Sequence, residues 1–341
     1  MKKIIVTGGS GFIGSNLVNF LIEKNFFVIN IDKLTYASNK YKNKIKNKKN
    51  YKFYKLDINN RKKLTKIIKE NKPVAIFNLA AETHVDRSID SPKQFISTNI
   101  LGVFNLLETI RNLQKERVKT KLIHISTDEV YGDIKSNIRS DENFSYNPSS
   151  PYSASKASAD HLVKSYIRTY KINAVISNCC NNYGPYQFPE KLIPKIIANI
   201  FSNKQLPIYA KGKNSREWIH VQDHCEALFM LYLKGKSGES YNVGSGTNLK
   251  NIDLVKKILK ICKIEKIKIG NKTKIIFVKD RPGHDYRYAL NSNKVFRTLK
   301  WKSKINLDEG ILSTVKWYQI NNKFLVKISK RLYEKRLGLK I

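Results

Sequence analysis

The chain has 341 residues, 41% of them hydrophobic, and a formal net charge of +37. This length suits one large or two modest domains, and no apolar run reaches the roughly 18 residues that suggest a membrane span. Lysine, asparagine and isoleucine are in excess along the whole chain, which indicates a solvated surface rather than a nucleic-acid footprint. The apolar stretch at the N-terminus is too short for a signal peptide, so we expect a cytoplasmic protein.

The cysteines form no C-x-x-C pair, so we expect reduced, buried side chains and no metal site. They are Cys179, Cys180, Cys225 and Cys262.

The first 180 residues alternate short β-branched runs with helical patterns. Strands are expected over 3–6, 27–31, 51–55, 74–79, 122–126 and 174–178, and helices over 12–24, 61–70, 92–116 and 152–170. This alternation predicts an α/β fold, a Rossmann-type parallel sheet wound on both sides. The stretch over 39–50, rich in lysine and asparagine, is expected to be a loop.

Past Asn181, prolines and glycine turns break the rhythm of the chain. A strand over 240–243 could return to the main sheet, and the other pieces suggest a smaller mixed lobe. We therefore predict a first, Rossmann-type domain over 1–180, with a returning segment near 218–243. A second lobe is predicted over 181–217 and 244–320, followed by a basic tail over 321–341.

A glycine motif follows the first expected strand and opens the first expected helix. Glycines at 9, 11 and 14 give G-x-G-x-x-G, and those at 8, 11 and 14 give G-x-x-G-x-x-G. Missing side chains let a pyrophosphate approach the backbone at a helix N-terminus. In this strand–turn–helix context the motif predicts a dinucleotide site, formed by Gly8, Gly11, Phe12, Ile13 and Gly14.

Asp32 ends the second expected strand, where an acid can bind both ribose hydroxyls and would repel a 2′-phosphate. NAD is therefore favoured over NADP. Asp57 and Ile58, after the third strand, are weaker candidates for the adenine. The small residues of Leu79-Ala80-Ala81, after the fourth strand, would let a cofactor pass close to the backbone.

Tyr152 and Lys156 lie one helical turn apart and so share a face. A neighbouring ammonium and a positive nicotinamide both favour the phenolate of the tyrosine, which can then act as a base. Thr127, at the end of the fifth strand, can form a hydrogen bond to the hydroxyl group from which Tyr152 would take a proton. Asp128 and Glu129 follow it directly, 23 residues before Tyr152. An acid and a base beside the tyrosine supply what the removal of water needs.

The chain resembles the extended short-chain dehydrogenase/reductase family through residues 7–14, 152–156 and 181–185. Other motifs resemble the branch of that family that dehydrates nucleotide sugars, and the match spans about residues 2–318. These motifs lie at 32–37, 84–88, 126–132, 188–194 and 280–285.

The resemblance implies that Tyr152 takes the proton of the C4 hydroxyl, with Thr127 and Lys156 beside it. Glu129 would remove the C5 proton, and Asp128 would protonate the departing C6 hydroxyl. The implied reaction converts dTDP-glucose to dTDP-4-dehydro-6-deoxy-glucose and water, with NAD recycled. An acidic donor needs a raised pKa, which burial supplies.

The resemblance also implies that the first domain, over 1–180, binds NAD and that the lobe over 181–217 and 244–320 binds the nucleotide sugar, and it implies further contacts. For the cofactor it implies Lys33, Leu34, Thr35, Thr98 and Asn182. For the substrate it implies Thr83, Asn181, Lys191, Leu192, Pro207, Ile208, Tyr209, Arg216, Asn251, Asp280, Arg281, Pro282, Gly283 and His284. Arg216 and Arg281 are assigned to the diphosphate, because a guanidinium fork matches phosphate oxygens. Family members pair as homodimers through the helices over 92–116 and 152–170, whose apolar faces could equally be core.

Alternatives remain open. The nearest is a UDP-sugar 4,6-dehydratase, 4-epimerase or decarboxylase of the same fold, and the acid pair after Thr127 argues against the last two. A remoter one is a non-enzymatic basic binding protein. Thymine and uracil differ by one methyl group, worth only about 1–3 kcal/mol, so the choice of dTDP depends on the resemblance alone.

Overall fold

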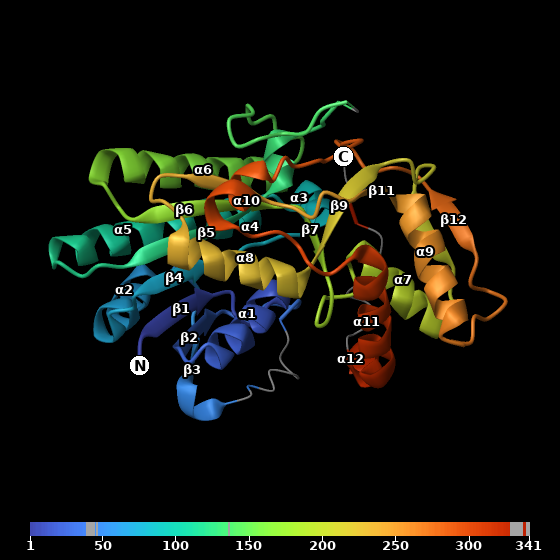
Figure 1. Cartoon of the computed structure of the whole chain (residues 1–341), viewed down its shortest axis with the longest axis horizontal. Helices are drawn as coiled ribbons and strands as arrows, with labels where there is room; N and C mark the ends of the chain where they lie inside the picture. Colours follow the sequence, from blue (N-terminus) through green and yellow to red (C-terminus); the bar gives the residue numbers. More distant parts are fainter. Residues whose placement is uncertain (39–44, 46, 136, 328–336, 339–341) are drawn as a thin grey trace.

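The computed structural model describes residues 1–38, 45, 47–135, 137–327 and 337–338. Its centre is a seven-stranded sheet in the order β10-β6-β5-β4-β1-β2-β3 (Figure 1), and every neighbouring pair is parallel. The strands are β1 (Lys3–Thr7), β2 (Phe27–Asp32), β3 (Tyr51–Lys55), β4 (Ala75–Asn78), β5 (Lys121–Thr127), β6 (Ala174–Cys179) and β10 (Ser240–Val243). The predicted α/β doubly wound class is confirmed.

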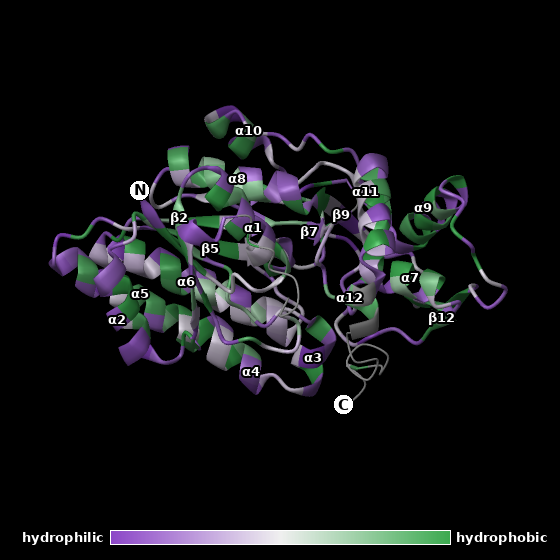
Figure 2. Ribbon diagram, turned by 90° about the horizontal axis from the view of Figure 1, so that it is seen from below, coloured by the Kyte–Doolittle hydropathy of each residue, from purple (hydrophilic) through white to green (hydrophobic). Residues whose placement is uncertain are grey.

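Helices cover both faces of this sheet. On one face lie α1 (Phe12–Glu23) and α8 (Val221–Lys234), and on the other α2 (Arg61–Asn71), α5 (Gly102–Lys115) and α6 (Pro151–Tyr170). Strand residues alternate between the two cores: in β1, Ile4 and Val6 join the first and Ile5 the second. Figure 2 shows the result: β5 is hydrophobic, whereas α5 carries both hydrophilic and hydrophobic residues. A parallel strand buried on both faces therefore reads as a continuous apolar run.

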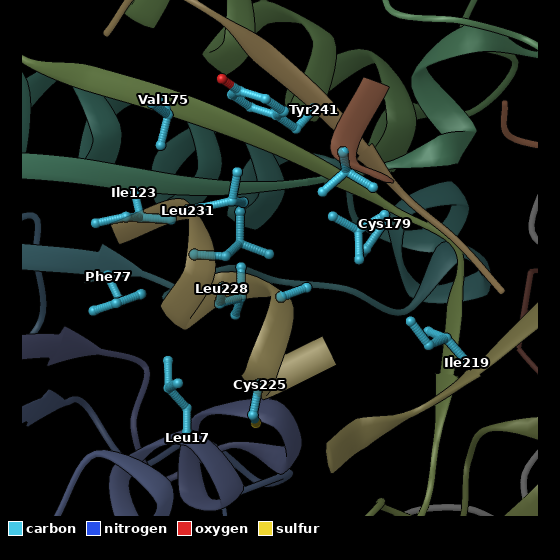
Figure 3. Packing of buried hydrophobic residues seen from close by; sticks show 14 of the residues in the cluster. Leu17, Phe77, Ile123, Val175, Cys179, Ile219, Cys225, Leu228, Leu231 and Tyr241 are labelled. Atoms are coloured by element: carbon cyan, nitrogen blue, oxygen red, sulfur yellow. The ribbon is translucent and has the colours of Figure 1, made fainter. Parts of the chain in front are cut away.

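The core under α1 and α8 is shown in Figure 3. Leu17 of α1 and Leu228 of α8 point toward Phe77 and Ile123 of the sheet. Cys225 lies in the same cluster, and all four cysteines are free and buried, as expected from their spacing.

Element bounds agree with the sequence prediction to within about one residue, except over 92–116. There the chain forms α4 (Lys93–Phe95), a π-helical stretch η2 (Ile96–Leu101) and then α5, rather than one α-helix. Gly102 packs so closely that a β-carbon there would lie 2.5 Å from Ile58 Cδ1. The π turn brings the consecutive polar residues Thr98 and Asn99 inward together, a use of such turns often found at functional sites. The short helix α3 (Val85–Asp90) was not predicted.

A second group of elements packs beside the sheet, at the right of Figure 1. It contains a three-stranded sheet, β11-β9-β7, and a two-stranded sheet, β12-β8. The strands are β7 (Asn181–Tyr183), β8 (Leu206–Tyr209), β9 (Ser215–His220), β11 (Asn248–Lys250) and β12 (Ile275–Val278), and the helices α7 (Leu192–Phe201), α9 (Asn251–Ile264) and α11 (Leu307–Ile320). These elements share their own apolar core. The division of the chain into a cofactor domain and a substrate lobe stays a prediction.

Smaller elements complete the chain: η1 (Lys48–Asn50), η3 (Asp128–Tyr131), α10 (Asn293–Leu299) and α12 (Asn322–Lys327). Most of the expected loop over 39–50 and most of the basic tail over 321–341 lie outside the described residues. Among the helices that the structure describes, none has both the length and the apolar character to cross a membrane.

We expect Leu228→Ala to lower the free energy of unfolding by about 2–5 kcal/mol, because it opens a cavity in the core of Figure 3. Leu233 lies on the same helix and is 53% exposed, whereas Leu228 is fully buried. Leu233→Ala is therefore the matched control and should change the unfolding free energy by less than about 0.5 kcal/mol. Urea titration measures both, and equal losses would contradict this packing.

Candidate active site

A cavity of about 1160 Å³ lies at the carboxyl ends of the parallel strands. The strand order reverses there between β1 and β4, which is where doubly wound sheets bind ligands. All five predicted catalytic residues line it: Thr127, Asp128, Glu129, Tyr152 and Lys156. So do the predicted cofactor residues Gly8, Gly11, Phe12, Ile13, Gly14, Asp32, Lys33, Thr35, Asp57, Ile58, Leu79, Ala80, Ala81, Thr98 and Asn182, and the predicted substrate residues Thr83, Asn181, Lys191, Leu192, Pro207, Ile208, Tyr209, Arg216, Asn251, Arg281 and His284.

The glycine loop leaves its backbone open to this cavity. Gly8 has φ +70°, and a β-carbon on it would lie 2.7 Å from Ala80 N. At Gly14 a β-carbon would lie 2.2 Å from the carbonyl oxygen of Gly8, so the turn closes only without side chains. Gly11, the N-cap of α1, meets only that oxygen, at 3.3 Å, and lines the cavity. The loop therefore fits a pyrophosphate at a helix N-terminus.

Asp32 is fixed by two backbone N–H groups. Ser10 N donates to Oδ2 at 2.9 Å, and Leu34 N donates to Oδ1 at 2.7 Å. A carboxylate has about four acceptor positions, so two are left for ribose hydroxyls. The neighbouring Lys33 extends its ammonium to Thr98 Oγ1 (3.1 Å) and to a carboxylate oxygen of Glu82 (3.3 Å). These contacts order the part of the cavity next to β2.

Tyr152 and Lys156 lie in the first turns of α6, which a Ser150–Ser153 capping box begins. Burial raises the pKa of Tyr152 well above its usual value, Glu129 adds to this, and the hydrogen bond with Thr127 opposes it. The ammonium of Lys156 instead donates to the carbonyl oxygen of Ile125 at 2.6 Å. The protein's own groups thus favour the neutral phenol, and the expectation that Lys156 and a bound nicotinamide together favour the phenolate stays a prediction.

Asp128 and Glu129 begin the turn η3, for which the Thr127 side chain is the N-cap. Burial raises the pKa of Asp128 well above its usual value, and the charges of Glu129 and Glu217 raise it further. Its Oδ2 atom is buried without a hydrogen-bond partner in the described part of the chain. Such a carboxyl group is protonated near neutrality and can donate to a bound molecule.

Glu129 is surrounded differently from its neighbour. Burial raises its pKa, but the cations Arg281, Lys191 and Arg216 all oppose that rise. Two adjacent carboxyl groups can serve as acid and base when their environments make their pKa values different. Asp128 fits the acid and Glu129 the base.

Of the two predicted diphosphate ligands, Arg216 is buried and Arg281 is half-buried. Arg216 donates to the carbonyl oxygens of Ser215 and Asp285, both at 2.8 Å, and stacks on the Tyr288 ring with Cζ 4.2 Å from its centre. Arg281 pairs with Asp86 at 3.1 Å, while its Nε atom is buried without a partner among the described residues. Both reach the cavity with their guanidinium groups already oriented.

Four predicted contacts do not line the cavity: Leu34, Asp280, Pro282 and Gly283. Leu34 acts through its backbone N–H on Asp32. Asp280 accepts from Arg281 N at 2.9 Å and lies 2.6 Å from His284 Nδ1, so it supports its neighbours instead. Gly283 has φ +61°, and a β-carbon there would lie 2.6 Å from the Ser149 carbonyl oxygen. We find no structural role for Pro282.

Sequence reasoning missed polar residues that meet at the cavity, notably His84, Asp86 and Glu190. Asp86 of α3 accepts from Tyr209 OH at 2.6 Å as well as from Arg281. Glu190 accepts from Tyr36 OH at 3.0 Å and from Arg87 Nε at 3.4 Å. His84, Asp86 and Glu190 all lie in the motifs at 84–88 and 188–194. The many polar side chains in these two motifs were the signal in the sequence that could have identified them.

Comparison with known proteins agrees with this geometry. The family model described as GDP-mannose 4,6 dehydratase matches residues 5–314. The chain is 45% identical to a probable dTDP-glucose 4,6-dehydratase of Sinorhizobium fredii, over 99% of each chain. A solved dTDP-glucose 4,6-dehydratase of Bacillus anthracis in complex with NAD shares 39% identity at a TM-score of 0.86, covering 96% of this chain and 100% of that one. One from Streptomyces venezuelae with NAD and TYD bound shares 37% identity at a TM-score of 0.89, with the same coverage. The chain therefore belongs to the nucleotide-sugar 4,6-dehydratase family that this model describes and that includes these dTDP-glucose 4,6-dehydratases.

Proposed function

We propose that this protein is a dTDP-glucose 4,6-dehydratase that uses NAD and forms dTDP-4-dehydro-6-deoxy-glucose and water. The observation that carries the proposal is that Tyr152, Asp128 and Glu129 line one cavity together with the glycine loop. An epimerase needs a tyrosine and a nicotinamide, but no acid and base for elimination. The names of the similar proteins support the same activity.

NAD fits the open glycine loop and the Asp32 carboxylate, whose free acceptor positions suit an unphosphorylated ribose. When bound, it accepts the hydrogen of C4 with its electron pair and returns it to C6. Lys156 and Tyr152 would flank the nicotinamide and its ribose. Burial favours the neutral phenol of Tyr152, so the positive charges of the nicotinamide and of Lys156 would be needed to favour the phenolate, the form that can take the proton of the C4 hydroxyl.

The remaining steps fall to the acid pair. Once C4 is a ketone, the proton on C5 is acidic, and Glu129 is placed to remove it. Asp128 is neutral because of its burial and gives its proton to the departing C6 hydroxyl as water forms. The proton that Glu129 holds can return to C5 when C6 is reduced. Tyr152 ends the cycle with the proton of the C4 hydroxyl and Asp128 without the proton that it gave, so one proton must pass from Tyr152 to Asp128 through solvent before the next turnover. No net oxidation results, so one cofactor serves many turnovers.

The substrate's diphosphate would lie against Arg216 and Arg281, with Lys191 nearby to add positive charge. The segment Pro207-Ile208-Tyr209 forms part of the cavity wall and would face the nucleoside. Lys191 also donates to the Thr83 carbonyl oxygen at 2.7 Å, a contact between the two sides of the cavity.

We also propose a homodimer formed through the surface of η2, α5 and α6. Ile96, Leu101 and Phe104 are 45%, 53% and 37% exposed on this surface. Burial of such side chains against a second copy would remove apolar area from water. The adjacent positions Val103 and Leu106 belong instead to the sheet core, so only part of the predicted apolar face is available.

With dTDP-glucose deuterated at C4, we expect the label to arrive at C6 of the 4-dehydro-6-deoxy product within the same molecule. Mixing labelled and unlabelled substrate and measuring product masses tests this transfer. UDP-glucose, run in parallel, should react more slowly. Label retained at C4 of a 4-epimer would reject the dehydratase assignment.

Glu129→Gln should lower kcat by about 10²–10⁴-fold, because no carboxylate remains to take the C5 proton. Oxidation at C4 does not need this group, so reduced nicotinamide should accumulate and be visible in the absorbance spectrum. Tyr152→Phe should lose activity without that accumulation. Glu70 is exposed on α2, and Glu70→Gln should behave as wild type. Normal turnover by Glu129→Gln would overturn the division of roles.

Asp128 should also leave a pH signature in stability. Its pKa is raised in the folded protein, so folding takes up a proton above the unfolded pKa, and the contribution of Asp128 to stability falls as pH rises from 4 toward neutrality. Asp128→Asn removes this loss, worth roughly 1.4 kcal/mol per unit of pKa shift. The variant should therefore gain on wild type between pH 4.5 and 7.5 in thermal unfolding. Asp253→Asn, at an exposed carboxylate of α9, should show no such gain, and an equal gain in both variants would contradict a neutral Asp128.

A further inference from the structure

A row of buried polar side chains crosses the sheet below the cavity. Thr7 Oγ1 of β1 donates to Asn78 Oδ1 of β4 at 2.7 Å, and Asn78 Nδ2 lies 3.1 Å from His124 Nδ1 of β5. His124 Nε2 lies 3.3 Å from Asp160 Oδ1 on α6. These four residues are almost completely buried. Polar groups in a parallel-sheet core are costly unless each has a partner, so such a row indicates a specific role.

The direction of this row follows from its hydrogen bonds. Because Asn78 Oδ1 accepts from Thr7, the amide nitrogen of Asn78 faces His124 Nδ1 and donates to it. The ring proton of His124 is then on Nε2, facing Asp160. Burial lowers the pKa of His124, so the ring is neutral. Its contact with Asp160 is not aligned as a hydrogen bond and acts through the N–H dipole.

Asp160 is an ionised carboxylate inside the protein. Its Oδ2 atom accepts from Ser126 Oγ at 2.7 Å, from Tyr146 OH at 3.0 Å and from Asn178 Nδ2 at 3.3 Å. Burial alone would raise the pKa of Asp160, but His124, Lys156 and Ser126 outweigh burial and lower it. A fully buried negative charge therefore lies one helical turn beyond Lys156, on the same face of α6.

The ammonium of Lys156 is also buried, and a nearby negative charge would stabilise it. Burial lowers its pKa, and Asp160 and then Cys179 raise it again. Cys179 is a buried thiol whose own pKa is raised by burial to about 12, so it is neutral. Asp160, one helical turn along α6, is thus the carboxylate whose charge offsets the burial of Lys156, while the hydrogen bond of the ammonium goes to the carbonyl oxygen of Ile125.

We propose that Asp160 is a positioning residue for the dehydratase reaction, whose buried carboxylate keeps Lys156 an ammonium and directs it beside Tyr152. The inference rests on the proposed function. Asp160 does not line the cavity and acts only through Lys156. The amide oxygen of an asparagine at this position could still accept hydrogen bonds from Ser126 and Tyr146, so hydrogen bonding alone does not require a charge there. A nearby buried cation does require one.

The first test compares the pH dependence of kcat with dTDP-glucose. Asp160→Asn removes the charge, so the alkaline limb should move to lower pH by about one unit or more. Tyr146→Phe removes one donor and keeps the carboxylate, so its alkaline limb should match wild type. A folded Asp160→Asn enzyme with an unmoved limb would overturn the inference. Failure of wild type to turn over dTDP-glucose would instead reject the proposed function.

The second test needs no turnover. In Asp160→Asn, the pKa of Lys156 falls further below its unfolded value, so the cost of its burial is full at low pH. That cost is relieved as pH rises through the folded pKa. The difference in Tm between wild type and Asp160→Asn should therefore shrink between pH 7 and pH 10. A constant difference would show a structural role only and overturn the inference.

A double-mutant cycle covers the case in which Asp160→Asn does not fold. Lys156→Met removes the cation, so Asp160→Asn should lower Tm much less in that background than in wild type, and the double variant should fold. Equal losses in both backgrounds, or a double variant that also fails to fold, would show that Asp160 serves its hydrogen-bond partners rather than Lys156.

Discussion

Removal of charged groups from water is the physical interaction on which this site depends. At the carboxyl ends of β1, β4, β5 and β6, burial acts on every ionisable side chain in the same sense, toward the neutral form. It raises the pKa of Asp128 and Tyr152 and lowers that of Lys156. A uniform effect of this kind would leave no base in the cavity. Different roles arise only where a second charge opposes burial.

Those opposing charges come from elements that are distant in sequence. Arg281, Lys191 and Arg216 oppose the rise at Glu129, and Asp160 opposes the fall at Lys156. Arg281 is itself oriented by Asp86, which also accepts from Tyr209. The electrostatic surroundings of Glu129 thus depend on a chain of contacts from α3 across to the segment after β12. Elements of the second group, beside the main sheet, therefore affect the protonation of a residue at the strand ends.

Much of the fold was predictable because the sheet is covered on both faces. Apolar runs such as Ile4-Ile5-Val6 mark the strands, and the glycine motif and the acids after Thr127 mark positions at the strand ends. The Tyr152–Lys156 pair marks the start of α6. Local patterns could not show which side chains oppose burial. His124 lies on β5 and Asp160 on α6, and Asp86 and Arg281 are separated by more than half of the chain. Such pairs depend on topology, and so does the π turn before Gly102, which the helical periodicity of 92–116 concealed.

That π turn restricts how the chain can vary. One residue of an α-helix corresponds to a rotation of about 100°, so loss of a single residue from η2 would turn everything before it around the helix axis. Asn99, which donates to Ser155 on α6 at 2.8 Å, and Phe95, whose ring is 6.3 Å from that of Tyr152, would no longer both meet their partners. Side chains in η2 can be exchanged one at a time, but an insertion or deletion there would change the wall of the cavity. The number of residues in this segment is therefore as much a part of the site as the identity of any one of them.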